Sequence, residues 1–446
     1  MAKKQESDRR RANAGAHWKP VAVVAILLAA TQPAHAINRF IQRNLVSSDV
    51  EYCPKVMLRP SLLNAWGVAV GPAGPDSHFW VPANLSGASF EFKGDVGGVQ
   101  LQTDALNKVR VPGPNGAPGT PTGVVYNTST GFVITQDSAN GPITAPAKIL
   151  FATDNGTISA WTERARGDGG FDRPAAAKVV IGGAGRGSQY FGLAISPVTQ
   201  RLFVADFGKN PQVRVYDGQF NEITAQMPVR NPFVGPLGPK PGDFVPFNVQ
   251  VLDDGAMEHL FVMYTRSQED PAHPGHILPG EEDSASGHGR LVEYDTSGNL
   301  VAIWKDRGML DSPWAVAYAP ADFGLGDHAL IVGNFGDGTA VAFNTNLKQA
   351  SYFLQDPFGN AIRIEGLWGM HFGDGVAAGR ANELYFGAGP DDETEGVFGK
   401  LLPQFPVTTE SRAALSDWMA EHQRCTQTID GQTQQATCAI PCTEAP

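Results

Sequence analysis

Six related stretches recur along this chain, and each pairs a short apolar strand with a second one shortly after it. The first strand opens with an aromatic residue or proline beside a small residue, as in Leu367-Trp368-Gly369-Met370, and the second is like Leu384-Tyr385-Phe386-Gly387-Ala388. The equivalent positions are 54 to 69 residues apart and are Gly67, Gly123, Gly192, Asn248, Ala315 and Gly369. A unit that repeats at this period and contains a hairpin is typical of a radial array of small sheets.

Further strands in several units set the size of each sheet. Third strands are clearest at 213–217 and 291–295, and a fourth is at 300–304. Three to four short antiparallel strands in each of six units predict an all-β, six-bladed β-propeller over residues 37–405. A β-sandwich array would need units of about 100 residues, and a β-helix would need much shorter ones, so both fit the period less well.

The first 36 residues have the three-part pattern of an export signal. Basic residues between Lys3 and Arg11 precede an apolar run from Val21 to Ala30, and Ala34-His35-Ala36 offers a small-x-small cleavage site. The apolar run is too short to span a membrane. We therefore predict a cleaved signal peptide over residues 1–36, an exported protein in the periplasm or outside the cell, and no transmembrane anchor after cleavage.

The charge of the chain without those residues limits the classes of partner. Residues 37–446 contain 28 basic and 43 acidic residues, a net charge of −15. No dense Lys/Arg stripe is present, so the electrostatic footprint of a nucleic-acid-binding protein is missing. The acidity suits an exported soluble protein and is compatible with cation binding.

The end of the chain differs from the repeats. Ala414, Leu415, Trp418 and Met419 have helical spacing, which predicts a short helix within 408–422 and a C-terminal segment over 406–446 that ends in a polar tail. The cysteines are Cys53, Cys425, Cys438 and Cys442. An even number of cysteines in an oxidising compartment predicts two disulfides, with three pairings open. A zinc site is the weaker alternative, because the spacing matches no common zinc pattern.

Polar residues that follow the second strand of each unit are the first candidate site. In a propeller these strands end at one rim of the central channel, where ligands usually bind. Oxygen-bearing side chains converging there would suit a divalent cation, Ca²⁺ above all. The predicted metal-site residues are Asn84, Asp137, Asp206, Asn334 and Asp391. The alternative is that these side chains only cap turns through their own backbone.

A long insertion between Thr265 and Gly289 is the second candidate site. It is rich in histidine and carboxylate side chains, which would suit a transition metal or a lid over the channel. The candidate residues are His273, His276, Glu281, Asp283 and His288. The alternative is a solvated, mobile loop.

Other motifs point to structure rather than chemistry. Trp66, Trp314 and Trp368 open three of the repeats, so we interpret them as packing residues between blades rather than as a ligand platform. Residues 185–189 lack the second glycine of a nucleophile elbow, and the glycine-rich stretch 182–187 has no βαβ unit around it. Residues 154–157 read Asp-Asn-Gly-Thr, which indicates a hairpin turn.

Several of these stretches together resemble one family. They are residues 64–67, 151–161, 246–250, 313–317, 332–338 and 366–369. The chain resembles, from about residue 44 to 402, an uncharacterised family of exported bacterial β-propellers that includes members with PEP-CTERM sorting tails and a mimivirus L-type hypothetical protein. The resemblance implies the fold and export but no activity, and the cysteine-bearing tail departs from the family pattern.

The chain is also similar, more distantly, to NHL-repeat and gluconolactonase-like propellers. That similarity implies a divalent cation on the axis and hydrolysis of lactones or esters. It requires an axial glutamate that the sequence does not place, so no catalytic residue is carried over. We therefore predict an exported propeller that binds a small-molecule, glycan or protein ligand at the channel mouth. The alternative is a divalent-metal-dependent hydrolase, and the sequence does not decide whether the protein is an enzyme.

Overall fold

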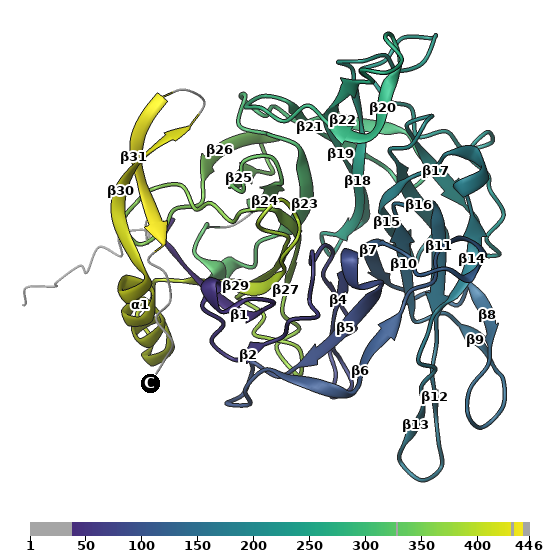
Figure 1. Ribbon diagram of the computed structural model, residues 1–446, viewed down its shortest axis with the longest axis horizontal. Coiled ribbons are helices and arrows are strands. Elements are labelled where there is room, and N and C mark those ends of the chain that lie inside the picture. The colour runs from purple at the N-terminus through teal and green to yellow at the C-terminus, as the bar shows by residue number, and fades with distance from the viewer. Residues whose placement is uncertain (1–37, 327–328, 430–431, 440–446) are drawn as a thin grey trace, which may run out of the picture. The chain divides into compact units, whose positions relative to one another are not determined.

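The computed structural model describes residues 38–326, 329–429 and 432–439, and side chains as far as His422. All described residues belong to one compact unit, Ala36–Pro446. This unit is a six-bladed β-propeller, in which six small sheets surround a common centre (Figure 1). The predicted fold is confirmed. The predicted signal peptide lies outside the described residues.

The first and fifth blades are regular four-stranded antiparallel sheets. The first contains β3 (Ala69–Val70), β4 (Phe79–Ala83), β5 (Ala88–Lys93) and β6 (Gln102–Arg110) in that order. The fifth contains β23 (Pro313–Tyr318), β24 (Ala329–Asn334), β25 (Ala340–Asn344) and β26 (Gln349–Phe353). In both, the second strand is buried along its whole length, because sheets of neighbouring blades cover both of its faces.

The second blade has the same order but carries two inserted hairpins. Its strands are β7 (Pro121–Tyr126), β10 (Ile149–Thr153), β11 (Thr157–Trp161) and β14 (Lys178–Gly182). The insertions are the pairs β8 (Val133–Gln136) with β9 (Ile143–Pro146), and β12 (Arg164–Ala165) with β13 (Phe171–Asp172), which extend away from the sheets at the lower right of Figure 1. The second strand of this blade is therefore β10, which Asp154 follows, and not the strand that precedes the predicted site residue Asp137.

The third and fourth blades differ in size. The third has only β15 (Tyr190–Ser196), β16 (Arg201–Asp206) and β17 (Gln212–Tyr216). The fourth has β18 (Phe244–Asp253), β19 (Glu258–Glu269), β21 (Gly289–Tyr294) and β22 (Leu300–Ile303), and β19 continues past the blade to pair with β20 (Ile277–Glu282). The predicted insertion in this unit is thus largely a two-stranded ribbon.

The sixth blade joins the two ends of the propeller. Its strands β27 (Leu367–Phe372), β28 (Leu384–Ala388) and β29 (Val397–Pro403) are followed in the sheet by β1 (Phe40–Ser47) from the start of the described chain. Strand β1 pairs with β29 from Phe40↔Pro403 to Ser47↔Val397 and with the short β2 (Met57–Leu58) on its other side. This pairing closes the ring through hydrogen bonds between segments more than 300 residues apart.

The glycine in the repeated phrase has a steric role where the inner strands meet. A Cβ atom on Gly369 would lie 2.6 Å from the backbone nitrogen of Val68 and 2.8 Å from the Cα atom of Gly67. Gly67 and Val68 directly precede β3, the inner strand of the first blade, which adjoins the sixth blade. Only a residue without a side chain allows this approach of two backbones.

A short helix and a hairpin follow the propeller. Helix α1 (Thr409–Glu421) begins with a capping box, in which Thr408 Oγ1 accepts from Ser411 N at 2.9 Å and Ser411 Oγ accepts from Thr408 N at 2.8 Å. Trp418 packs with Ile41, Leu402 and Phe358, so the helix covers part of the sixth blade. The predicted helix is confirmed.

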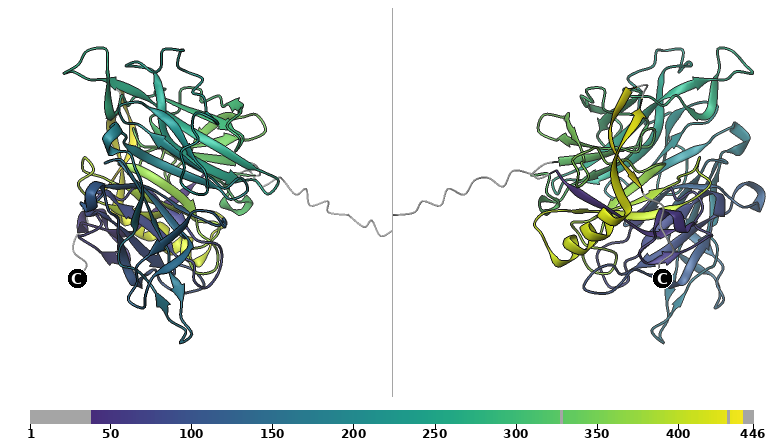
Figure 2. Two further views of the ribbon diagram at one scale, coloured as in Figure 1. Left: turned by 90° about the vertical axis from the view of Figure 1, so that its right-hand side faces the viewer. Right: turned by 60° about the vertical axis from the view of Figure 1, so that its left-hand side comes forward.

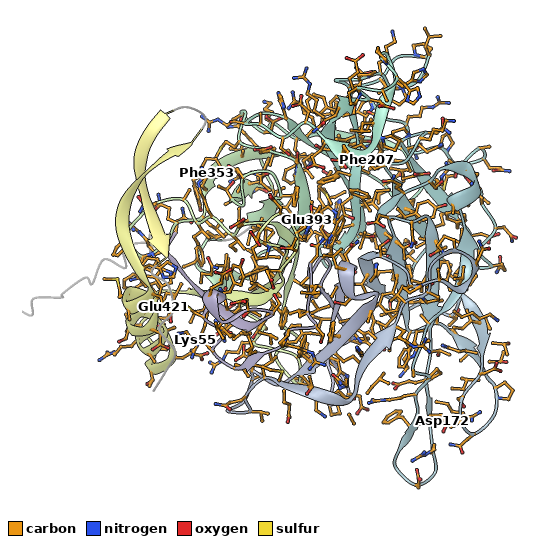
Figure 3. The ribbon with its side chains drawn as sticks, viewed as in Figure 1. Lys55, Asp172, Phe207, Phe353, Glu393 and Glu421 are labelled. Carbon is orange, nitrogen blue, oxygen red and sulfur yellow. The ribbon has the colours of Figure 1, made fainter. Side chains whose placement is uncertain are left out.

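The segment after the helix comes forward with it in the right-hand view of Figure 2. It forms β30 (His422–Ile429) and β31 (Gln432–Ala439), a hairpin that the sequence did not predict. Lys55 pairs with Glu421 at the end of α1 (Figure 3).

Cys53 is disulfide-bonded, whereas the side chains of the three tail cysteines lie outside the described residues. Within the described ranges, no helix is long and apolar enough to cross a membrane.

Candidate functional site

One face of the propeller collects the ends of twelve strands. In every blade the first two strands are antiparallel, so the start of the first and the end of the second lie together. The register shows these paired ends in three blades as Tyr190 with Asp206, Pro313 with Asn334, and Leu367 with Ala388. We call this face the channel mouth. It is the face on which the sequence analysis placed the first candidate site.

Aromatic side chains fill the propeller axis. The rings of Trp66 and Trp368 stack with centroids 3.6 Å apart, and the ring of Phe335 stacks on the other side of Trp368 at 3.9 Å. Trp314 meets Trp66 and Trp368 edge-on, at 6.1 and 5.7 Å. All three tryptophans are at most 4% exposed, so they contribute packing at the axis, in agreement with the interpretation from the sequence. Their indole N–H groups have no acceptor among the described residues.

Asp154 joins the first and second blades at the mouth. It follows β10, and its Oδ2 atom accepts from Asn84 Nδ2 at 2.9 Å, while Oδ1 accepts from the hydroxyl of Thr120. Asn84 follows β4 in the same way, so the two side chains come from equivalent positions of neighbouring blades. Burial raises the pKa of the Asp154 carboxyl, although these two hydrogen bonds oppose the shift.

Glu393 is held at the mouth by a buried asparagine. Asn64 is 2% exposed, and its Nδ2 atom donates to Glu393 Oε2 at 2.6 Å. The Oδ1 atom of Asn64 is buried with no hydrogen-bond partner in the described part of the chain. Burial raises the pKa of Glu393, and the negative charges of Asp154 and Glu281 add to the shift. Glu393 therefore lies among other carboxyl groups, near the centre of the view in Figure 3.

The β19–β20 ribbon brings Glu282 to the same group. The backbone N–H of Gly280 donates to the carbonyl of Phe207 at 3.0 Å, which fixes β20 against the third blade. Burial raises the pKa of Glu282 to about 7, and the charges of Glu393 and Glu281 act in the same direction. We call Asp154, Glu281, Glu282 and Glu393 the mouth carboxyls. Burial raises the pKa of three of the four, Asp154, Glu282 and Glu393, and the charges of neighbouring carboxylates add to the shift for Glu282 and Glu393.

The five residues predicted as a metal site do not form one cluster with these carboxyls. Asp206 is fully buried, and its Oδ2 accepts from Arg214 Nε at 2.6 Å. Asn334 is also fully buried, and it donates to the carbonyl of Met309 and to Thr339 Oγ1, each at 2.9 Å. Both side chains hold local backbone and neighbouring side chains in place, which is the alternative that the sequence left open.

The other three predicted residues have separate positions. Asn84 lies at the mouth and donates to Asp154. Asp391 follows β28 and is exposed, where it accepts from the hydroxyl of Thr394 at 3.1 Å. Asp137 follows β8, so it belongs to an inserted hairpin of the second blade and not to the end of a second strand. Asp154 occupies the place that the sequence analysis gave to Asp137.

The second set of candidate residues is divided along the β19–β20 ribbon. His273 and His276 are exposed between the two strands, and His273 Nδ1 lies 2.8 Å from Asp270 Oδ2. His288 lies at the other end, where its Nε2 atom is 3.0 Å from Arg266 Nη1. Asp283 pairs with Arg266 at 3.4 Å, and Glu281 is one of the mouth carboxyls. Among the residues the structure describes, no three His, Cys, Asp or Glu side chains are placed to hold a metal ion.

Asp154, Glu282 and Glu393 were not among the predicted site residues, and the omission of two of them has an identifiable reason. Asp154 stands in an Asp-Asn-Gly sequence, a pattern that indicates a hairpin turn. Glu393 lies five residues beyond the end of β28, so it falls outside a search for the first polar residue after each strand. The continuous apolar run of β10 directly before Asp154 was a usable signal, because other second strands have the same pattern.

Comparison with known proteins finds distant relatives. No family model matches the sequence. One uncharacterized protein of Acanthamoeba polyphaga mimivirus is 25% identical over 77% of this chain and 75% of its own length. A second from the same virus is 26% identical over 77% of this chain and 81% of its own length. These viral proteins are distant homologues, which confirms that part of the resemblance.

Among solved structures, one match has low sequence identity to this chain. A chain in the crystal structure of a nidogen–laminin complex is 11% identical and aligns with 76% of this chain and 97% of its own length, with a TM-score of 0.38.

Proposed function

We propose that this protein is a binding propeller whose ligand or partner attaches at the channel mouth through a positively charged group. The observation that carries the proposal is the arrangement of Asp154, Glu282 and Glu393 at the mouth, where Asn84 holds the first, Asn64 holds the third and the hydrogen bond between Gly280 and Phe207 fixes the strand of the second. Burial raises the pKa of all three carboxyls, and the charges of neighbouring carboxylates add to the shift for Glu282 and Glu393. A cationic group placed among them would favour the ionised forms and offset both effects.

The surroundings of the mouth carboxyls support a binding role. Asp154 and Glu393 accept hydrogen bonds from the side-chain amides of Asn84 and Asn64. These amides are neutral, so they do not balance the negative charge of the carboxylates. By contrast, Asp206 is compensated by Arg214. An ammonium or guanidinium group from a ligand would complete the mouth in the same way, and the overall acidity of the chain would attract it over a longer range.

The test uses a tetralysine peptide as the probe and tetraglutamate as the opposite-charge control. We expect tetralysine to bind at low ionic strength, and the double variant Glu282→Gln/Glu393→Gln to weaken its binding about tenfold. Binding should also strengthen between about pH 6 and pH 8, because Glu282 ionises in this range. Isothermal titration calorimetry measures both effects.

A matched control is Asp137→Asn, which removes an exposed carboxyl from the inserted hairpin. This variant should bind tetralysine like the parent protein. Equal affinity of the parent and the double variant would contradict the proposed site, and equal binding of tetraglutamate would contradict the proposed charge of the ligand. In a second test, Ca²⁺ is titrated into the parent protein and the double variant. A melting temperature that rises with Ca²⁺ only in the parent would show that a bound metal ion supplies the positive charge at the mouth.

The proposal includes export, as the sequence analysis predicts. Its support is the three-part pattern of residues 1–36, together with the disulfide at Cys53. The resemblance to exported bacterial propellers with PEP-CTERM members supports the same conclusion. We expect the full chain, expressed in a bacterium with a periplasm, to be recovered there with Ile37 as its first residue, as measured by mass spectrometry. Recovery of the uncleaved chain in the cytoplasm would contradict the prediction.

A further inference from the structure

A cavity lies between the first and second blades, at the end of the inner strands opposite the channel mouth. It has a volume of about 200 Å³ and is bounded by the turn between β3 and β4 on one side and by the second blade on the other. The share of liquid volume taken by one water molecule is about 30 Å³. The cavity is therefore large enough for a small organic molecule.

Aromatic rings form part of its wall. Trp80 comes from β4, Trp161 from the end of β11, and Tyr126 from the end of β7. The two indole rings lie with centroids 5.0 Å apart at an angle of 55°. Both are at most 4% exposed, and Trp161 Nε1 donates to the carbonyl of Pro174 at 2.7 Å, so the rings are fixed in orientation. Rigid aromatic walls with a few polar groups are typical of small-molecule sites.

The charged side chains of the inner wall already satisfy one another. Glu163 accepts from Lys148 Nζ and from Arg173 Nε, each at 2.6 Å. Arg173 also pairs with Asp104, which in turn lies 3.1 Å from His78 Nε2. Lys148, Glu163, Arg173 and Asp104 therefore form a continuous series of opposite charges, and His78 lies within hydrogen-bond distance of its last member. A charged ligand would have to break one of these pairs, whereas a neutral ligand would leave them intact.

Glu91 is the exception on this wall. It is 2% exposed, it lines the cavity, and its Oε2 atom has no hydrogen-bond partner among the described residues. Leaving a buried polar atom without a partner is unfavourable, and such atoms are rare in folded proteins. A hydroxyl group of a molecule in the cavity would supply the missing hydrogen bond.

We propose that this cavity binds a neutral, hydroxyl-rich small molecule, of the size and chemistry of a monosaccharide unit. The apolar face of the sugar ring would pack on the half-buried ring of Tyr126, beside the edges of Trp80 and Trp161, and one hydroxyl would bond with Glu91. Burial raises the pKa of Glu91 to about 8, and the negative charge of Asp104 adds to the shift. The carboxyl is therefore mostly protonated at neutral pH, so it both donates and accepts hydrogen bonds. This site is independent of the one proposed at the channel mouth.

The test measures binding of D-glucose, D-galactose and N-acetyl-D-glucosamine by saturation-transfer-difference NMR and calorimetry. D-Glucuronic acid serves as the anionic analogue. We expect at least one neutral sugar to bind at millimolar concentration and D-glucuronic acid to bind about tenfold more weakly, because the lysine and arginine of the wall are already paired with carboxylates. If no neutral sugar binds, or if D-glucuronic acid binds equally well, the proposed ligand class is wrong.

Variants locate the binding within the molecule. Glu91→Met removes the hydrogen bond and should weaken binding about tenfold, whereas Glu91→Gln keeps a donor and an acceptor and should bind like the parent. Gly74→Leu fills the cavity from its rim; a Cβ atom there meets only Pro72 O, at 3.9 Å, so this variant tests the site without changing Glu91. Asp137→Asn is the control. Sugar binding that survives both Glu91→Met and Gly74→Leu would place the ligand elsewhere and overturn the proposal.

Discussion

Replacing Lys400 by methionine should lower the free energy of unfolding by about 3–5 kcal/mol, because the change leaves buried carboxylates without their countercharge. Lys400 lies on β29 and is 1% exposed. Its Nζ atom is 2.7 Å from both Asp95 Oδ2 and Glu383 Oε2, and 3.2 Å from Glu410 Oε1. These partners come from the first blade, the sixth blade and helix α1, so one ammonium group connects three parts of the structure.

Urea denaturation followed by tryptophan fluorescence measures the effect on Lys400→Met. The control is Lys209→Met, which removes an exposed lysine for which no ion pair is observed within the described ranges, and which should change stability by less than about 0.5 kcal/mol. Part of the loss should be recovered in the double variant Lys400→Met/Glu383→Gln, because one of the stranded charges is then absent. A loss below about 1 kcal/mol for Lys400→Met would show that water or local rearrangement compensates the three carboxylates.

The sequence predicted the fold because the repeated signal is local. Each blade carries its inner strand and a largely apolar second strand within one stretch of chain, and Gly369 in the repeated phrase allows the close contact of the sixth blade with the first. The closure of the ring by β1 was not predictable in this way. It pairs with β29 across more than 300 residues, and no local pattern specifies that partner.

The error in the second blade has a physical cause. The inserted strand β8 follows Phe132 and begins with Val133 and Ile134, so the sequence there resembles a second strand of the repeat and lies at the expected distance from Gly123. The true second strand, β10, is apolar at nearly every position because other strands cover both of its faces. The short apolar run at the expected distance therefore favoured an edge hairpin over the core strand, and with it Asp137 over Asp154.

The candidate sites were less predictable than the fold because loops assemble them. Glu282 reaches the mouth on a ribbon that extends from the fourth blade, and Glu393 arrives from a turn after the sixth blade's second strand. Glu91 carries no motif at all, since a glutamate in an apolar strand shows its significance only when its surroundings are known. Desolvation, which shifts the pKa of each of these carboxyls, depends on neighbours that are distant in the sequence.

The stability of the protein should depend on pH through Glu91. Its pKa is raised from 4.5 to about 8 in the folded state, first by burial and then by the charge of Asp104, while Arg173 opposes the shift. Between these two values the folded protein holds a proton that the unfolded chain has released. Unfolding therefore becomes easier as the pH rises, by about 1.4 kcal/mol for each pH unit, or about 4 kcal/mol from pH 5 to pH 8.

The variant Glu91→Gln isolates this contribution, because glutamine resembles the protonated carboxyl and has no proton to lose. We expect it to be about as stable as the parent near pH 5 and more stable by about 4 kcal/mol near pH 8, as measured by urea denaturation at each pH. Asp154, Glu282 and Glu393 also have raised pKa values, so the variant should keep the pH dependence that they cause. Asp137→Asn should follow the parent at every pH. Parallel pH profiles for Glu91→Gln and the parent would show that Glu91 is ionised in the folded protein at neutral pH, with Arg173 and Lys148 as its compensating charges.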